Sequence, residues 1–292
     1  MQIVFHSPVP GGVLELSSAA YARSSKLAVV LGGGRGCVLK LDGEFTAIWI
    51  PLRGRLQLGT DSLLHSGEVC VTEPEACQRA IGRGNALWVA ILGTADVWRH
   101  ALGRLLDVPG LGKTLLPARH RADRELRRLA VAVARAKASA DLEVEAVLER
   151  ICTLQGSLVE AIERCPGRTH AQRRHVFARL QRVCNYLDSN CHLELDNDAL
   201  ARLANYSPWH FIRAFRAAYG ETPHAYLVRR RLERACRLLR GSHLAISEVA
   251  LASGFENRCA FSRLFRQRFG TTAGAMRRQV GEVRRAALPP GR

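Results

Sequence analysis

The first third of the chain alternates between short apolar runs and turn residues. The apolar runs lie at 38–41, 45–50, 56–58, 69–72 and 86–92. Short strands separated by glycine-containing turns are typical of a small β-barrel or sandwich. Asp42-Gly43 lies between the first two runs, and this dipeptide predicts a two-residue hairpin that pairs them.

Two tryptophans, Trp49 and Trp88, fall within these predicted strands. A barrel that binds a small molecule lines its cavity with apolar and aromatic side chains. Both residues are therefore candidates for an effector pocket, and packing in the core is the alternative interpretation.

From residue 121 the apolar spacing changes to three and four residues, the period of an amphipathic helix. One apolar stripe runs from Leu126 to Val133 and a second from Val144 to Ile162. We expect these helices either to pack on the sheet or to pair between subunits. Pro166-Gly167 then ends the second helix and begins a predicted linker.

The C-terminal third contains one helix-turn-helix pattern twice. Ala201 and Asn205 of the first copy correspond to Ala250 and Gly254 of the second. A small alanine lets the two helices of a unit cross closely, and the turn between them needs positive φ, which glycine and asparagine adopt most readily. Two copies are too few for a solenoid, so the pattern predicts a paired module.

The second helix of each copy has an inward stripe built on two phenylalanines, Phe211 and Phe215 in the first and Phe261 and Phe265 in the second. Ser207 is expected to cap the first of these helices. Arginine on the outward face can bind guanine edges or phosphates. The candidate DNA-contacting residues are Ser207, Trp209, His210, Ile212, Arg213 and Arg216, and then Asn257, Arg258, Cys259, Ser262, Arg263 and Arg266.

The segments SPWHFIRAFR and ISEVALASGFENRCAFSRLFRQRFG resemble the AraC/XylS family of bacterial transcription regulators. The resemblance covers the C-terminal third and implies a seven-helix domain whose two recognition helices enter major-groove segments about 34 Å apart. Ile212 and Cys259 depart from the polar residues frequent there, so no operator sequence follows. The resemblance places Trp209, Ile212, Arg213, Arg258, Cys259 and Arg263 at base-facing or backbone-facing positions.

The helix that joins the two units is predicted to begin at Pro223 and to end at Gly241. Each arginine on it is expected either to contact phosphate or to lie in a solvated basic face. The arginines considered are Arg229, Arg230, Arg231, Arg234 and Arg237.

The net charge of +17 is unevenly distributed. Residues 171–292 contain 22 arginines and no lysine against 9 acidic residues. Such asymmetry is typical of nucleic-acid binding. A membrane-surface helix would need bulky exposed apolar residues, and no basic leader or 18-residue apolar run is evident. We expect a cytoplasmic protein without a membrane partner.

Two enzyme-like signals fail on inspection. Gly112-Lys113-Thr114 resembles the end of a phosphate-binding loop, but Asp107 occupies the position of the required first glycine. A metal site in a barrel needs several converging ligands, and His65 is the only histidine between His6 and His100. We therefore expect no enzyme, no cofactor and no metal.

The nine cysteines form no CxxC spacing, and we expect reduced, buried thiols. A thiol-based redox sensor that uses Cys70 and Cys77, or Cys184 and Cys191, is an alternative that would need a depressed thiol pKa.

The expected fold class is α+β, with an N-terminal β-barrel or sandwich and a C-terminal all-α domain with two helix-turn-helix motifs. Because a cupin-like sensor barrel precedes this domain in many relatives, we expect one here. The expected segments are the sensor domain at 1–118, a helical dimerisation or packing segment at 119–165, a linker at 166–175, the DNA-binding domain at 176–280 and a disordered tail at 281–292.

The expected function is an effector-responsive, sequence-specific transcription activator. Its expected partners are double-stranded operator DNA, RNA polymerase, a small-molecule effector and a second copy of the chain as a homodimer. A protein that binds DNA without sequence preference is the other alternative.

Overall fold

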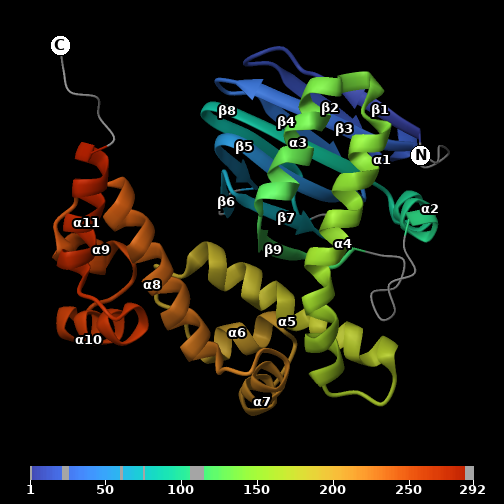
Figure 1. Cartoon of the computed structure of the whole chain (residues 1–292). Coiled ribbons are helices and arrows are strands. Elements are labelled where there is room, and N and C mark those ends of the chain that lie inside the picture. Colours follow the sequence, from blue (N-terminus) through green and yellow to red (C-terminus); the bar gives the residue numbers. More distant parts are fainter. Residues whose placement is uncertain (1, 22–25, 60–61, 75, 106–114, 287–292) are drawn as a thin grey trace, which may run out of the picture. The chain divides into compact units, whose positions relative to one another are not determined.

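The computed structural model describes residues 2–21, 26–59, 62–74, 76–105 and 115–286 (Figure 1). By contacts between Cα atoms the chain divides into two compact units, Met1–Asn185 and Tyr186–Arg292. The phosphate-loop-like Gly112-Lys113-Thr114 lies outside the described residues.

The first unit contains a mixed sheet and the helices that cover it. Its strands are β1 (Gln2–His6), β2 (Val13–Ser17), β3 (Lys26–Gly34), β4 (Val38–Asp42), β5 (Thr46–Leu58), β6 (Ser62–His65), β7 (Glu68–Thr72), β8 (Arg79–Gly93) and β9 (Ala118–Arg121). Its helices are α1 (Ser18–Tyr21), α2 (Ala95–Leu105), α3 (Arg124–Ala136) and α4 (Asp141–Arg164), and α5 (His170–Asn190) crosses the division between the units.

The long strand β8 organises the sheet. It pairs antiparallel with β5 along its length, from Thr46↔Gly93 to Leu58↔Ala80. On its other edge it pairs antiparallel with β3 and then with β4. The parallel pairs β1–β3 and β2–β4 extend that side, while β6, β7 and β9 extend the side of β5.

The predicted hairpin at Asp42-Gly43 is wrong, because β4 pairs with β2 and β8 and not with β5. Gly43 does adopt positive φ, at 88°. The connection between β4 and β5 instead contacts the start of α1, where the Glu44 N–H donates to Ser18 Oγ at 3.2 Å. Strands β4 and β5 pair with opposite edges of β8, and β8 therefore lies between them.

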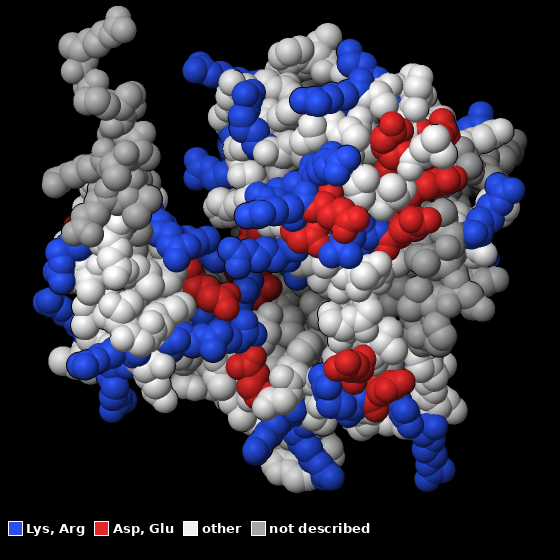
Figure 2. Space-filling view, in the orientation of Figure 1, with Lys and Arg blue, Asp and Glu red and all other residues white. Residues whose placement is uncertain are grey.

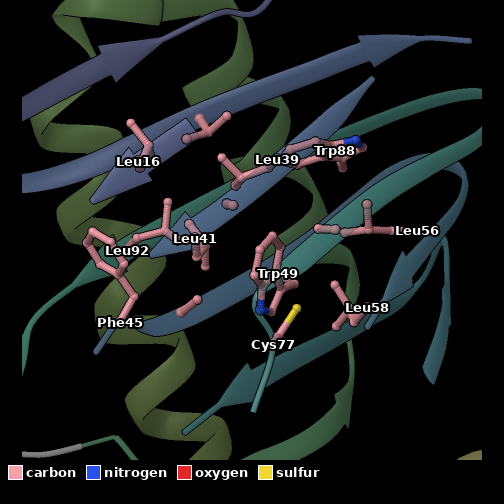
Figure 3. Packing of buried hydrophobic residues seen from close by; sticks show 14 of the residues in the cluster. Leu16, Leu39, Leu41, Phe45, Trp49, Leu56, Leu58, Cys77, Trp88 and Leu92 are labelled. Carbon is pink, nitrogen blue, oxygen red and sulfur yellow. The ribbon is translucent and has the colours of Figure 1, made fainter. Parts of the chain in front are cut away.

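One face of the sheet encloses an apolar core, shown in Figure 3. Trp49 and Trp88 lie there, both with 0% exposure and with ring centroids 6.2 Å apart. The Trp49 indole donates to Thr72 Oγ1 at 3.0 Å. A Cβ on Gly32 would lie 2.1 Å from the Trp88 ring, so glycine is needed for this packing. Both tryptophans thus pack in the core, and their effector-binding role stays a prediction.

Helices cover the opposite face of the sheet. Ile48, Ile50, Val89 and Ile91 alternate with the core residues along β5 and β8 and are also fully buried. Helices α3 and α4 cross this face in Figure 1, and α3 contacts both strands. The two central strands are therefore buried on both faces, which explains their nearly continuous apolar runs.

The second unit is helical and contains the end of α5 and the helices after it. These are α6 (Asn197–Leu203), α7 (Pro208–Tyr219), α8 (Pro223–Gly241), α9 (Ile246–Ala252), α10 (Arg258–Phe269) and α11 (Ala273–Ala286). Counted with α5, the described part of the chain has the seven helices that the resemblance implied. In the described residues no helix is long and apolar enough to span a membrane.

Three secondary-structure elements extend across boundaries of the predicted segments. Strand β9 pairs with β7 through Val71↔Ala118, so the sheet continues past residue 118. Helix α5 begins at His170, inside the predicted linker 166–175. Helix α11 continues to Ala286, inside the predicted tail 281–292. Of these three elements, β9 is placed by its pairing with β7, which local composition does not reveal.

His120 on β9 generates a prediction about acid stability. Its Nε2 is buried without a hydrogen-bond partner in the described residues, and burial lowers its pKa from 6.5 to about 4. Below pH 6.5 the unfolded chain takes up a proton that the folded chain does not, so the free energy of unfolding falls by up to about 3 kcal/mol between pH 6.5 and 4.

His120→Gln should remove the part of the acid-induced fall in the free energy of unfolding that comes from this histidine. Urea unfolding of both proteins at pH 7.5 and pH 4.5 measures the difference. The same pH dependence in both proteins would show that His120 is not its source.

Candidate nucleic-acid interface

The two helix-turn-helix units have the same backbone construction. Asn205 and Gly254 have φ of 51° and 90°, as the sequence predicted. In each turn the next residue bonds back to the small alanine: the Tyr206 N–H donates to Ala201 O at 2.9 Å, and the Phe255 N–H donates to Ala250 O at 3.0 Å. The duplicated sequence pattern therefore encodes a duplicated structure.

The recognition helices α7 and α10 begin with different caps. Ser207 occupies the N-cap of α7, but its hydroxyl does not cap the backbone and shares a 2.7 Å hydrogen bond with His210 Nδ1. Asn257 Oδ1 does cap α10, accepting from the N–H groups of Cys259 and Ala260 at 2.8 and 3.0 Å. The predicted cap at Ser207 is wrong because the histidine one turn later takes its hydroxyl.

The two phenylalanines of each recognition helix point inward. Phe211, Phe215, Phe261 and Phe265 are fully buried. Of the twelve predicted contact residues, Ile212 is half-buried. The exposed ones are Ser207, Trp209, His210, Arg213, Arg216, Asn257, Arg258, Cys259, Ser262, Arg263 and Arg266.

Aromatic contacts orient part of the exposed face of α7. The Arg213 guanidinium carbon lies 5.4 Å from the Trp209 ring centroid, and the ring of His210 meets the same indole edge-on at 5.0 Å. A cation over an indole face is attracted to it. Arg213 is therefore held near one orientation before any ligand binds.

Two arginines of α8 belong to an internal ion-pair network. Arg229 contacts Glu221 and Glu233 at 2.9 and 3.2 Å. Arg230 contacts Asp188 at 2.5 Å and Glu233 at 2.6 Å. Acidic side chains accordingly lie among the basic ones over α8 in Figure 2. The side chains of Arg229 and Arg230 are only 28% and 18% exposed and bind carboxylates of the same unit, a role that differs from the two that the sequence left open.

Two further arginines of α8 bind carbonyl oxygens at helix ends. Arg231 donates to Cys191 O and Leu193 O, both at 2.8 Å, just after α5 ends. Arg234 donates to Ala252 O at 2.9 Å, at the last residue of α9. Unsatisfied carbonyls and the helix dipole both favour a cation at a helix C-terminus. Helix α8 is thereby joined to the C-terminal ends of both α5 and α9.

Gly254 has a second role that its φ alone does not show. A Cβ there would lie 2.9 Å from Cys191 O and 3.0 Å from His192 Cα. The turn between α9 and α10 therefore packs directly on the α5–α6 connection. Sequence reasoning found the glycine but missed this contact and the arginines that support it.

The cysteines named for redox sensing are buried. Cys70, Cys77, Cys184 and Cys191 are at most 7% exposed. Burial raises the pKa of Cys77 to about 12 and also raises that of Cys191. A reactive thiol needs the opposite shift, so the structure disfavours the redox alternative. Within the described residues no three His, Cys, Asp or Glu side chains form a group that could hold a metal ion.

Gly254→Ala should destabilise the protein by about 2 to 5 kcal/mol, since left-handed backbone strain costs about 1 to 2 kcal/mol and overpacking about 1 to 3. The matched control is Gly220→Ala, because Gly220 has φ of 75° but nothing within 4 Å of the position that its Cβ would take. Urea unfolding of both variants separates the two effects. Equal losses would mean that the contact with Cys191 adds no constraint.

A family model described as "Helix-turn-helix domain" matches residues 200–279. The chain is 33% identical over 95 residues to the MmsAB operon regulatory protein of Pseudomonas aeruginosa, covering 32% of this chain and 31% of that protein. It is 42% identical over 87 residues to the transcriptional regulator GlxA of Rhizobium meliloti, covering 30% and 27%. The matched segments thus span less than a third of these two regulators.

The regulatory protein SoxS of Salmonella typhimurium is 30% identical over 101 residues, which cover 35% of this chain and 94% of SoxS. Among solved structures, the DNA-binding domain of the transcriptional factor AdpA in complex with a target DNA is 31% identical, with a TM-score of 0.35, over 38% of this chain and 98% of that one. An AraC-type regulator from Chromobacterium violaceum is 28% identical, with a TM-score of 0.34, over 38% and 95%. With SoxS matched over nearly its full length, the chain belongs to the AraC/XylS family of transcription regulators.

Proposed function

We propose that this protein regulates transcription by binding operator DNA sequence-specifically through α7 and α10. The observation that carries the proposal is the duplicated geometry. Each unit presents two exposed arginines at equivalent positions, Arg213 and Arg216 on α7 and Arg263 and Arg266 on α10. A helix of this kind fits the major groove, where arginine binds guanine O6 and N7.

The link through α8 supports simultaneous use of the two helices. Arg231 and Arg234 bind backbone carbonyls on both sides of α8, and Gly254 packs on the α5–α6 connection. A rigid joint reduces the entropy lost when two helices dock on one duplex. The two recognition helices are thus presented as one preorganised binding surface.

The rest of the proposed activity concerns the unit Met1–Asn185 and the response to signals. As an effector-responsive activator in the cytoplasm, the protein would contact RNA polymerase, and this unit would bind a small molecule or pair two copies. Its sheet supports a sensor of the cupin-like kind. An effector would act only through different affinities for DNA-competent and incompetent arrangements.

Selection from random DNA followed by footprinting tests the function. At about 0.15 M salt with excess competitor DNA, the full-length protein should protect two adjacent major-groove segments. Protection that spreads over all sequences and disappears with competitor would favour the alternative of a nonspecific DNA-binding protein, whose affinity depends on phosphate contacts.

Arg213→Ala and Arg263→Ala should each relax specificity at one position of the selected site, at a cost of about 1 to 3 kcal/mol. The reason is the loss of a bidentate contact to a base. Competition binding against probes with every base at each position measures the effect. Arg99→Ala removes the same charge from the other compact unit and should leave specificity unchanged. A loss that is equal for all probes would assign the arginine to phosphate.

A further inference from the structure

The two recognition helices can be compared residue by residue, because their sequences align with a constant offset. Asn257 follows Ser207 by 50 residues at the N-cap, and Gly270 follows Gly220 by 50 residues at the C-cap. The exposed arginines Arg213 and Arg216 recur as Arg263 and Arg266. Because these side chains are the same in both units, a difference in the kind of base that the two units read is sought at the other outward positions.

At three outward positions an apolar residue of α7 is replaced on α10 by a smaller or more polar one. Trp209 on α7 corresponds to Cys259 on α10, and Ile212 corresponds to Ser262. Further along, exposed Ala217 corresponds to exposed Gln267. The outward face of α7 is therefore apolar at positions where that of α10 is small or polar.

Trp209 and Ile212 lie three residues apart, which places them on the same side of the helix. Trp209 is 63% exposed in the free protein, although an indole of this size is normally well buried. Its contacts with His210 and Arg213 hold the ring on the outward face. The pair thus forms a small apolar surface beside an arginine, on the face that is proposed to meet DNA.

The major groove has one strongly apolar feature, the 5-methyl group of thymine. We propose that Trp209 and Ile212 make α7 a reader of thymine methyl groups, whereas α10 reads its half of the operator without them. The proposal rests on the proposed DNA-binding function. It predicts an operator whose two halves differ in base composition and therefore fix the orientation of the protein on DNA.

Uracil substitution tests this directly, because deoxyuridine lacks only the methyl group. The operator comes from the selection with full-length protein, and Arg213→Ala and Arg263→Ala identify which half lies under which helix. Replacing thymines with deoxyuridine under α7 should weaken binding about three- to fivefold for each methyl contacted. The same replacement under α10 should leave affinity unchanged.

Ile212→Ser gives α7 the residue of α10 and should reduce the preference for thymine over deoxyuridine. Trp209→Cys repeats the test at an exposed side chain, without disturbing the core. The matched control is Ser262→Ala, which should leave the preference under α7 intact.

Several results would overturn the inference. These are a half-site under α7 without thymine, equal uracil effects in both halves, or a preference that survives both α7 substitutions. If selection yields no operator at all, the proposed function fails first and this inference fails with it.

Discussion

Hydrogen bonds from the guanidinium groups of α8 to the ends of other helices hold the DNA-binding unit together. Arg231 and Arg234 satisfy carbonyls at the ends of α5 and α9, and Arg230 pairs with the nearly buried Asp188 of α5. Arginine suits this task because its rigid fork of donors can bind two acceptors at once, as Arg231 does. The spacing of α7 and α10 depends on these contacts, because both recognition helices are connected to α8.

The same residue type therefore has two roles in this unit. On α7 and α10 the arginines are exposed and available to a ligand, while on α8 most bind groups within the protein. The high arginine content thus overstates the positive surface offered to DNA. Net charge indicated the class of ligand correctly, but only the contacts show which arginines remain available.

The sequence predicted those features of the interface that depend on local backbone geometry. Positive φ at Asn205 and Gly254 follows from the residue types, and the inward phenylalanines follow from helical spacing. The partners of Arg231 lie about 40 residues away in the chain, so no local pattern could reveal them. The loss of the Ser207 cap to His210 likewise depends on side-chain geometry that sequence does not specify.

In the N-terminal unit, local signals located several strands but not their partners. The runs at 38–41, 45–50, 69–72 and 86–92 coincide with observed strands, because buried strands are continuously apolar. The pairing of β4 with β8 is nonlocal and overrode the turn signal at Asp42-Gly43. Strands β1, β2 and β9 are short and carry polar residues, so their place in the sheet depends on neighbours remote in sequence.

The distribution of the cysteines has a practical consequence. Eight of the nine thiols are buried and free, and Cys259 is exposed in the first turn of α10. A maleimide dye added to the native protein would therefore attach at a single atom. That atom lies on the face of the second recognition helix, so the rate at which the unlabelled thiol reacts would report whether this helix is occupied.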